Sequence, residues 1–380
     1  MTGPIVVVGA GGAQGRELVG YVRSGAPDAD ILAVDRQFSD TALARLEALS
    51  ARTLRLDLLK DTAKVREAFE GARIIVNLAG PFYVLGAAVL DAAIAAGVPY
   101  LDICDDVDAT ETLLSRSQAA REAGCAAVIG MGSAPGTTNL LVKLALENLA
   151  HVEGEKSADI AWCAPDSDLT FGIFHHLVHC FKTALPGRNT VPDWSELGPR
   201  TVAFPEPVGD VEVVRLGHPE PLTLKTYLDC PTHLRGGMTS AGVLRHAWEL
   251  ARACDQGRPV ADAWRELEAS LGSADGGAPG LSGMVIDVMV GGEGIRFESA
   301  TSISMEQSTA VPAAGVALMM LAGQGPGPGV WPPEALSPAD FFEASHRVSP
   351  GGGGLRAFRL SHGQPTDRLS LRALFSPAAA

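Results

Sequence analysis

The chain has 380 residues, of which 46% are hydrophobic and 19% charged. This composition is typical of a compact folded protein, and a prior of about 150 residues per domain predicts two domains. Its 30 Lys and Arg against 44 Asp and Glu give a net charge of −14, which argues against nucleic acid or an anionic membrane as a partner, because both are bound by surplus cations.

Short apolar runs alternate with longer helical stretches over the first 130 residues. We expect strands at 5–9, 31–34, 53–56, 74–78, 98–103 and 126–129. The intervening helices are expected at 16–23, 41–49, 65–69, 87–96 and 110–123. This alternation predicts right-handed βαβ units and a doubly wound parallel sheet of Rossmann type.

The pattern changes beyond residue 157, where apolar and polar residues alternate over longer stretches. Residues 284–290 and 295–304 flank a glycine-rich turn and predict a hairpin, and 211–216 with 222–228 predict another antiparallel pair. Helices are expected at 242–253 and 261–271, and a loop at 323–333. The second half is therefore predicted to be an α+β domain built on an antiparallel sheet.

These elements predict the domain boundaries. We expect an N-terminal Rossmann domain at 1–135, an α+β substrate and dimerisation domain at 136–307, and a C-terminal extension without an assigned role at 348–380. The apolar helix at 308–323 and residues 338–347 are expected to return to the first domain. A homodimer is expected from base rates for soluble enzymes.

The cysteines, the N-terminal residues and the lengths of the apolar runs indicate in which compartment the protein is expected. The six cysteines include no C-x-x-C pair and are too few for a disulfide scaffold, so reduced thiols and a cytoplasmic protein are expected. We see no basic head or cleavage site of a signal peptide. No apolar run reaches the roughly 20 residues that a membrane span needs.

A glycine loop follows the first predicted strand. Gly9, Gly12 and Gly15 fit G-x-x-G-x-x-G, with Ala13 and Gln14 inside the motif. A tight turn, a close backbone approach and a helix N-terminus together bind pyrophosphate. The alternatives are a glycine turn without a ligand and a methyltransferase, although methyltransferases usually lack the third glycine.

Acidic residues end the next two strands. Asp35 follows Gly15 by 20 residues, where a carboxylate can hold the adenosine ribose. Asp35 favours NAD by repelling a 2′-phosphate, whereas Arg36 can pair with that phosphate and favour NADP. Asp57 and Leu58 close the third strand, where adenine usually lies. The cofactor is therefore expected to be NAD or NADP.

Three further segments, together with the glycine loop, resemble the saccharopine dehydrogenase family in its reductase-like branch. They are Asn77–Phe82, Tyr100–Asp106 and Gly130–Asn139, and a fourth segment, Gly329–Glu334 before Pro338–Phe342, is similar to that family's C-terminal signature. The resemblance spans residues 4–150 and 280–347. Relatives often have Glu where this chain has Asp106.

The resemblance implies a Rossmann domain that binds NAD(P) and a hydride transfer at a C–N bond, by imine reduction or secondary-amine oxidation. The implied substrates are amino acids, polyamines or their semialdehydes. Two alternatives stay open: an oxidoreductase acting on a C=O or C=C bond, since a fold does not fix its chemistry, and a Rossmann protein that binds a dinucleotide without catalysis.

In an open α/β sheet, ligands lie beyond the carboxyl ends of the strands. We expect the nicotinamide to be bordered by Ala79, Gly80 and Pro81. The substrate is expected to contact Phe82, Tyr83, Asp105 and Thr137.

Asp106 and Cys104, which follow the fifth strand, are candidate catalytic residues. Asp106, like Asp105, can hold an iminium or ammonium group, and Cys104 can supply a thiol. The alternatives are that both aspartates cap a helix starting near Asp108 and that Cys104 is a buried structural cysteine.

A histidine-rich helix is predicted at 171–181. His176 is a candidate acid, and His175 and His179 are candidate substrate contacts, because imidazole titrates near neutrality. His175 and His179 have the i, i+4 spacing of metal ligands, but without a nearby third ligand we expect no metal. The prolines around Glu220 can present His218 or Glu220 to a cleft. Candidate carboxylate anchors are Arg200, Lys225 and Arg235.

Overall fold

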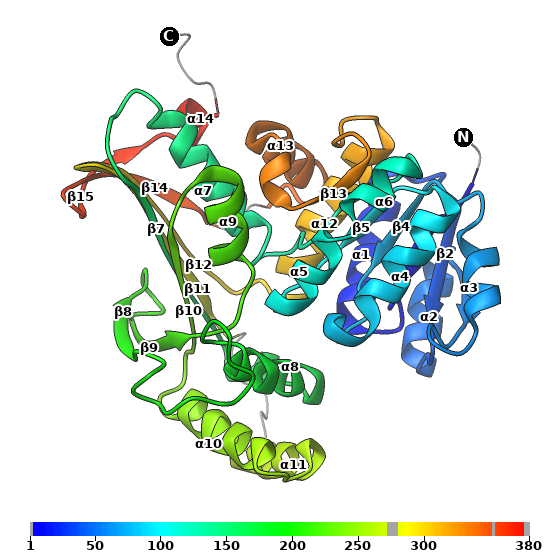
Figure 1. Ribbon diagram of the computed structural model, residues 1–380, viewed down its shortest axis with the longest axis horizontal. Coiled ribbons are helices and arrows are strands. Elements are labelled where there is room, and N and C mark those ends of the chain that lie inside the picture. The colour runs from blue at the N-terminus through cyan, green and yellow to red at the C-terminus, as the bar shows by residue number, and fades with distance from the viewer. Residues whose placement is uncertain (1–2, 272–279, 352–353, 376–380) are drawn as a thin grey trace. The chain divides into compact units, whose positions relative to one another are not determined.

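The computed structural model describes residues 3–271, 280–351 and 354–375. The chain forms two compact units, one of Met1–Leu140 with Glu306–Gly352 and one of Leu141–Met305 with Gly353–Ala380, and each unit has a sheet of its own (Figure 1). This confirms the predicted fold class. Of the extension predicted at 348–380, residues 352–353 and 376–380 lie outside the described residues.

The first unit contains seven parallel strands in the order β13-β6-β5-β4-β1-β2-β3. They are β1 (Ile5–Val8), β2 (Ile31–Asp35), β3 (Arg52–Arg55), β4 (Ile74–Asn77), β5 (Tyr100–Asp102), β6 (Ala126–Val128) and β13 (Gly329–Trp331). The prediction of a loop throughout 323–333 is wrong, because 329–331 pair with β6 and extend the sheet by one strand. The order reverses between β1 and β4, as in a doubly wound sheet.

Helices cover both faces of this sheet. They are α1 (Ala13–Gly25), α2 (Asp40–Ala48), α3 (Thr62–Phe69), α4 (Phe82–Ala96), α5 (Val107–Leu114), α6 (Ser117–Glu122), α12 (Met305–Leu321) and α13 (Pro338–Val348). Helix α1 packs beside α2 and α13, whereas α4 packs between α3 and α5. The helix predicted over 110–123 is two helices, because a turn at 115–116 separates α5 from α6.

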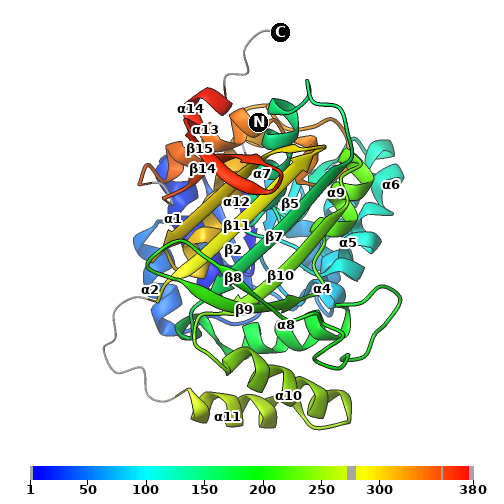
Figure 2. The same ribbon diagram turned by 90° about the vertical axis from the view of Figure 1, so that its left-hand side faces the viewer.

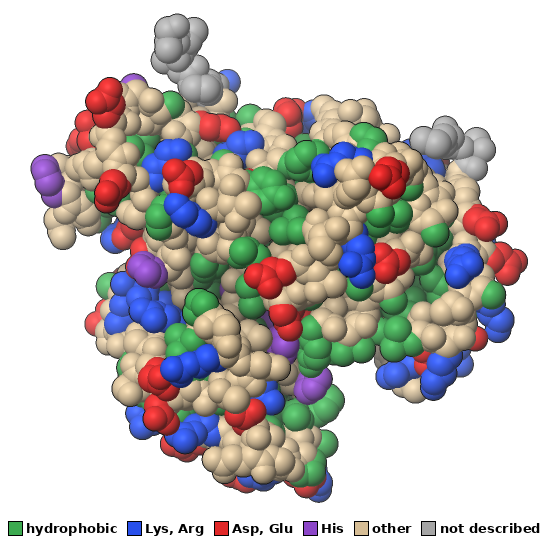
Figure 3. All heavy atoms as spheres, in the orientation of Figure 1, with side chains coloured by type: hydrophobic (Ala, Val, Ile, Leu, Met, Phe, Trp, Pro, Cys, Tyr) green, Lys and Arg blue, Asp and Glu red, His purple; other side chains and the backbone are tan. Residues whose placement is uncertain are grey.

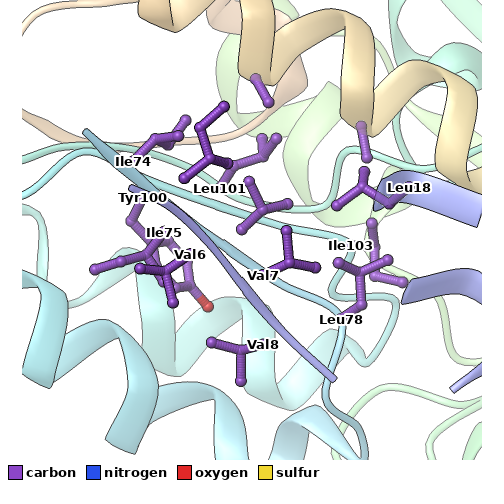
Figure 4. Packing of buried hydrophobic residues seen from close by; sticks show 14 of the residues in the cluster. Val6, Val7, Val8, Leu18, Ile74, Ile75, Leu78, Tyr100, Leu101 and Ile103 are labelled. Atoms are coloured by element: carbon purple, nitrogen blue, oxygen red, sulfur yellow. The ribbon is translucent and has the colours of Figure 1, made fainter. Parts of the chain in front are cut away.

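The core of the first unit follows from the apolar strands. Every residue of β1 and β4 is buried, as expected for strands covered on both faces. Figure 4 shows Val7 and Leu101 pointing to one face of the sheet, and Val6, Val8 and Tyr100 to the other. This packing fixes where each strand ends, and therefore where the loops that follow the strands begin.

The second unit contains an eight-stranded sheet in the order β15-β14-β12-β11-β7-β10-β9-β8, whose strands lie side by side in Figure 2. They are β7 (Lys156–Ala164), β8 (Arg200–Ala203), β9 (Asp210–Arg215), β10 (Thr232–Met238), β11 (Ser282–Val290), β12 (Glu293–Thr301), β14 (Arg356–Ser361) and β15 (Gln364–Leu369). The β11–β12 hairpin confirms its prediction. The pairs are antiparallel except for β7 with β10. Strand β14 pairs with β12, and β15 pairs with β14 at the edge of the sheet.

The remaining helices are α7 (Thr137–Asn148), α8 (Phe171–Lys182), α9 (Glu220–Leu228), α10 (Val243–Asp255), α11 (Val260–Ser270) and α14 (Leu371–Leu374), with short 3₁₀ turns η1 (Asp166–Asp168) and η2 (Pro333–Ala335). Helices α8, α10 and α11 pack against one another. The strand predicted at 222–228 is wrong: these residues are in α9, and β9 pairs with β8 and β10. Pro221 stands in the first turn of α9, where its missing N–H costs nothing.

The surface carries both signs of charge, and acidic and basic side chains are interspersed on the face shown in Figure 3. No helix within the described residues is long and apolar enough to cross a membrane.

Candidate functional site

In the loop between β1 and α1, two glycines are required because the backbone around them leaves no room for a side chain. Gly9 has φ +82°, and a Cβ atom there would lie 2.7 Å from the backbone nitrogen of Ala79. A Cβ at Gly15 would lie 2.2 Å from the carbonyl oxygen of Gly9. Both distances are far inside van der Waals contact, so no other residue fits at these two positions without a shift of the backbone.

Gly12 differs from these two glycines. It is exposed and is the N-cap residue of α1, and a Cβ there would meet only the Gly9 carbonyl oxygen, at 3.3 Å. Gly12 has no side chain to cap the helix, and Ala13 and Gln14 follow it in the first turn. The protein leaves the space beside Gly12 open, and the helix N-terminus attracts an anion to that space.

Asp35 lies beside this loop at the end of β2. Its Oδ2 atom accepts a hydrogen bond of 2.9 Å from the Gly11 N–H, and its Oδ1 atom accepts one of 3.2 Å from the Gln37 N–H. Arg36 is exposed. The structure therefore brings Asp35 and the glycine loop together. A carboxylate that binds the ribose and a loop that binds the pyrophosphate of one dinucleotide must lie side by side in this way.

Past the end of β3, Asp57 is held by the turn that it begins. Its Oδ1 atom accepts hydrogen bonds from the N–H groups of Leu59 and Lys60, at 3.1 and 3.2 Å. Leu58 is half-buried and packs against the core of the first unit. These residues stay a predicted adenine contact.

A buried hydrogen-bond network, not foreseen in the sequence, ties the carboxyl ends of β4, β5 and β6 together. Asn77 accepts from the Ala79 N–H (3.0 Å) and donates to the Tyr100 hydroxyl (3.1 Å). That hydroxyl donates to Asp102 Oδ2 (2.9 Å), while Asp102 Oδ1 accepts from the N–H groups of Cys104 (3.0 Å) and Gly130 (2.8 Å). The network fixes the loops that carry Ala79, Cys104 and Gly130.

Asp102 is uncharged over an unusually wide pH range. Burial raises its pKa from 3.8 to about 6, although the hydrogen bonds from Cys104 and Gly130 act in the opposite direction. Burial also raises the pKa of Tyr100 well above its ordinary value, so this hydroxyl remains a hydrogen-bond donor at neutral pH. In the sequence Asp102 is a single Asp at the end of an apolar run, and nothing nearby indicates that it links three loops by hydrogen bonds.

Asp106 caps a helix, but a different one from the helix considered in the sequence. Its Oδ2 atom accepts hydrogen bonds from the N–H groups of Phe82 and Tyr83, at 3.1 and 3.3 Å, at the start of α4. It stands at the N-cap position of α5, yet its side chain makes no cap there. Asp106 thereby links the Gly80–Pro81 turn to the turn after β5, and Asp105 beside it is half-buried.

Cys104 is fully buried, with its Sγ atom 3.7 Å from the Asp106 carbonyl oxygen and 3.6 Å from the Thr110 hydroxyl. Burial, followed by the charges of Asp102 and Asp106, raises the pKa of the Cys104 thiol well above its ordinary value. The thiol is therefore protonated at neutral pH and is a weak nucleophile. Its catalytic role stays a prediction that this environment does not favour.

The loop before α7 is held by a buried pair from distant parts of the chain. Asn139 Oδ1 accepts from the Gly136 N–H at 2.9 Å, and its Nδ2 donates to Glu334 Oε1 at 2.8 Å. Thr137 donates through its hydroxyl to the Gly132 carbonyl oxygen at 3.3 Å. Glu334, in η2, thus supports the loop that carries Thr137, and nothing in the local sequence signals this contact.

The predicted histidines lie on α8 in the second unit, where their partners differ from the predicted pattern. His175 stacks on Phe171 with ring centroids 6.1 Å apart. The i, i+4 pair that meets is His176 with Cys180, whose Nε2 and Sγ atoms are 3.0 Å apart. The backbone carbonyl of His179 accepts from the Thr183 hydroxyl.

The cations considered as carboxylate anchors are paired. Arg200 and Arg235 both contact Asp159, the latter at 3.2 Å, and Lys225 pairs with Asp229. Arg200 and Asp159 line a pocket of about 270 Å³ that also contains Asp287 and Arg296. Because the carboxylates balance the cations, this pocket does not favour an anionic ligand.

Comparison with known proteins supports the assignment of the first unit. Residues 5–128 match the family described as saccharopine dehydrogenase NADP binding domain. This match confirms the resemblance noted in the sequence and agrees with NAD or NADP as the expected cofactor. No curated protein matches the chain in sequence.

Solved structures share the fold of the whole chain. An apo saccharopine dehydrogenase (L-Glu forming) from Saccharomyces cerevisiae has a TM-score of 0.62 at 12% identity, covering 94% of this chain and 100% of its own. A homospermidine synthase from Legionella pneumophila, in complex with NAD, has a TM-score of 0.65 at 11% identity, covering 98% and 94%. At these identities the similarity is one of fold.

Proposed function

We propose that this protein transfers a hydride at a C–N bond, by reducing an imine or oxidising a secondary amine, with an amino-acid or polyamine-like substrate. The observation that carries the proposal is the open space at Gly12 beside Asp35, within a domain of the matching family. The proposal of C–N chemistry is supported by the two proteins of similar fold, because saccharopine and homospermidine, the compounds in their names, are both secondary amines.

The residues of the first unit fit a dinucleotide. Gly12 and the first turn of α1 bind the pyrophosphate, and Asp35 binds the adenosine ribose. Asp57 and Leu58 are proposed to contact the adenine, and Ala79 and the Gly80–Pro81 turn the nicotinamide. When bound, NAD(P)H supplies the hydride.

We propose NAD rather than NADP as the preferred cofactor. The Asp35 carboxylate is fixed by Gly11 and Gln37, so it cannot easily turn away from a ribose 2′-phosphate. The repulsion between that phosphate and Asp35 exceeds the attraction that the exposed Arg36 can supply, because exposed ion pairs are weak.

Asp105 is proposed as the carboxylate that contacts the iminium nitrogen of the substrate. A protonated imine accepts hydride more readily than a neutral one, and a carboxylate beside its nitrogen favours the protonated form. Hydride addition to the carbon then yields the neutral amine. Asp105 follows β5 and is half-buried, whereas Asp106 is committed to the start of α4. Asp106 is therefore proposed as a positioning residue, which fixes Phe82 and Tyr83 beside the Gly80–Pro81 turn.

Substrate contacts from Phe82, Tyr83 and Thr137, and from His175 and His179 in the second unit, remain proposals. His176 was predicted as an acid, but its Nε2 atom faces Cys180 and so contacts another side chain of its own helix. We therefore assign the proposed chemistry to the carboxylates of the first unit.

The test is an activity screen with mixtures of amines and aldehydes or keto acids, in which NADH and NADPH consumption is compared. We expect turnover only when amine and carbonyl are both present, with NADH preferred. Asp105→Asn should lower kcat about 100-fold, whereas the matched control Asp108→Asn, at an exposed position, should not change it. Equal reduction of ketones without any amine would contradict the proposal.

A further inference from the structure

A cluster of metal-ligating side chains occurs in the second unit. Helix α8 contributes His176 and Cys180, and the segment between β9 and α9 contributes His218. The potential ligand atoms of these three side chains all lie within 4.8 Å of one another. Glu220, two residues after His218, has its Oε2 atom 3.4 Å from Nδ1 of His218.

The local structure explains why these side chains converge. Residues four apart on a helix share one face, so His176 and Cys180 lie one above the other. Gly217 fits tightly against α8, because a Cβ there would lie 2.0 Å from the Thr183 hydroxyl oxygen, and its N–H donates to the Cys180 carbonyl. This contact holds His218 against the helix, with the His176 and His218 ring centroids 6.1 Å apart.

Most of the cluster is buried, and His176 is half-buried. Cys180 is 1% exposed, His218 is 7% exposed and Glu220 is fully buried. A bound metal ion would replace the thiol proton of Cys180, because the thiolate is the form of cysteine that binds metals.

The ligand set is one that Zn²⁺ prefers. Thiolate and imidazole bind zinc at about 2.3 and 2.0–2.1 Å, which places ligand atoms of a tetrahedral site roughly 3.3–3.6 Å apart. The His176 Nε2 to Cys180 Sγ distance is 3.0 Å, so these two atoms would move apart by roughly 0.5 Å on binding zinc. Glu220 Oε2 lies 3.4 Å from Nδ1 of His218 without a hydrogen bond between them in this structure. With Glu220 on the Nδ1 side, Nε2 is left for the metal, and a small rotation of either side chain would give the carboxylate–histidine–zinc arrangement that fixes a ligand's tautomer.

We propose that His176, Cys180 and His218 bind a divalent metal ion, Zn²⁺, with Glu220 orienting His218. This replaces the expectation, drawn from the sequence, that the chain binds no metal. Three protein ligands leave the fourth position of the tetrahedron to water or another small ligand. Trp162, whose ring centroid is 5.8 Å from that of His218, has a buried Nε1 without an acceptor among the described residues.

The proposal does not depend on the hydride-transfer function, so its test uses metal content and spectroscopy rather than activity. The full chain is stripped with a chelator, loaded with ZnCl₂ or CoCl₂, desalted and measured for bound metal and melting temperature. We expect about one zinc per chain and a rise in melting temperature on loading. The Co²⁺ form should show a thiolate-to-cobalt charge-transfer band together with intense visible bands of a tetrahedral ion.

Variants separate a built site from adventitious binding. Cys180→Ser should abolish the charge-transfer band, and Glu220→Gln should weaken zinc binding about 10- to 100-fold while keeping all three ligands. The controls are Cys163→Ser, a buried cysteine of the same unit outside the cluster, and His233→Gln, an exposed histidine. Neither control should change the bound zinc or the Co²⁺ spectrum.

Either of two results would overturn the proposal. One is wild-type protein that holds less than about 0.2 zinc per chain after loading and melts at an unchanged temperature. The other is a Co²⁺ spectrum and zinc content that are the same in wild type, Cys180→Ser and Glu220→Gln. If Cys180→Ser does not fold, Glu220→Gln and the wild-type spectrum still decide the question.

Discussion

The glycine loop of the first unit and the histidine–cysteine cluster of the second unit are built in opposite ways. The loop is contiguous: Gly9, Gly12 and Gly15 lie within seven residues, and Asp35 joins them from the next strand. The cluster joins a helix to a turn about 40 residues later, and the contact exists only because Gly217 packs on α8.

The two regions differ in the groups on which their chemistry depends. The loop obtains its chemistry from backbone groups, so its function is sensitive to any atom added near Gly12 and insensitive to most side-chain changes. The cluster obtains its chemistry from buried side chains, so losing one partner leaves the others uncompensated. Five substitutions follow, from the largest expected effect to the smallest. Four of them test this contrast, and Asp102→Asn tests the hydrogen-bond network at the strand ends.

Gly15→Ala should have the largest effect, because the added Cβ would lie 2.2 Å from the Gly9 carbonyl oxygen and must push the loop from β1. We expect a loss of about 4 kcal/mol in the free energy of unfolding, measured by urea denaturation. Gly20→Ala in the same helix is the control, since its Cβ would meet only Leu49, at 4.0 Å. Equal stability of the two variants would show that the loop is not packed as described.

His218→Gln should destabilise the second unit by about 3 kcal/mol, because Cys180 and Glu220 lose a buried partner. His233→Gln, at an exposed position, should change stability by less than about 0.5 kcal/mol. Both are compared by denaturation in the same buffer with a chelator present. A His218→Gln variant as stable as wild type would mean that the cluster makes no net contribution to folding.

Asp102→Asn tests the network at the strand ends through pH. The folded-state pKa of about 6 lies above the ordinary 3.8, so the folded state binds the proton more tightly than the unfolded state. The stabilisation from this group is complete below about pH 4 and is lost as the pH rises through 6, by about 3 kcal/mol. We expect wild-type stability relative to Asp102→Asn to fall by that order between pH 4 and pH 7.

The difference between wild type and Asp102→Asn must be taken at each pH, because other groups titrate over the same range. A difference that stays constant from pH 4 to pH 7 would show that Asp102 is not held in its protonated form.

Gly12→Ala should affect binding and spare the fold. Its methyl group would meet little of the protein but would enter the space proposed for the pyrophosphate. We expect the Kd for NADH to rise about 10- to 30-fold, equivalent to about 1.4 to 2 kcal/mol, as measured by calorimetric titration. The melting temperature without cofactor should change little. If affinity is unchanged, the dinucleotide does not bind against this face of Gly12.

Asp35→Asn should have the smallest effect, on cofactor choice. The amide oxygen can still accept a hydrogen bond from Gly11, but the negative charge that repels a 2′-phosphate is gone. The ratio of NADPH to NADH affinity should rise about tenfold, measured by paired titrations. A ratio that does not move would assign cofactor choice to residues other than Asp35.

The sequence predicted best what local patterns encode. The six strands from β1 to β6 and the glycine loop each carry their signal within a few adjacent residues, and the structure contains all of them. Residues 222–228 misled because Leu and polar residues alternate there, which imitates a strand. The prolines at 219 and 221 instead mark the start of a helix, because proline is favoured in a first helical turn.

The parts that escaped prediction depend on contacts between distant residues. Asn139 meets Glu334 across almost 200 positions, and Asp106 reaches the start of α4 rather than its own helix. On α8, spacing alone favoured His175 with His179. The pair that forms is instead His176 with Cys180, a contact that the spacing of the histidines did not indicate.

The central claim, hydride transfer to a C–N bond, is tested most directly with NADH that carries deuterium at the transferable position. The protein is given an amine and a carbonyl compound that together form an imine, and the product is examined by mass spectrometry. The account predicts a secondary amine with one deuterium on the former imine carbon. Deuterium found only in an alcohol from the carbonyl compound, with none in the amine, would contradict it.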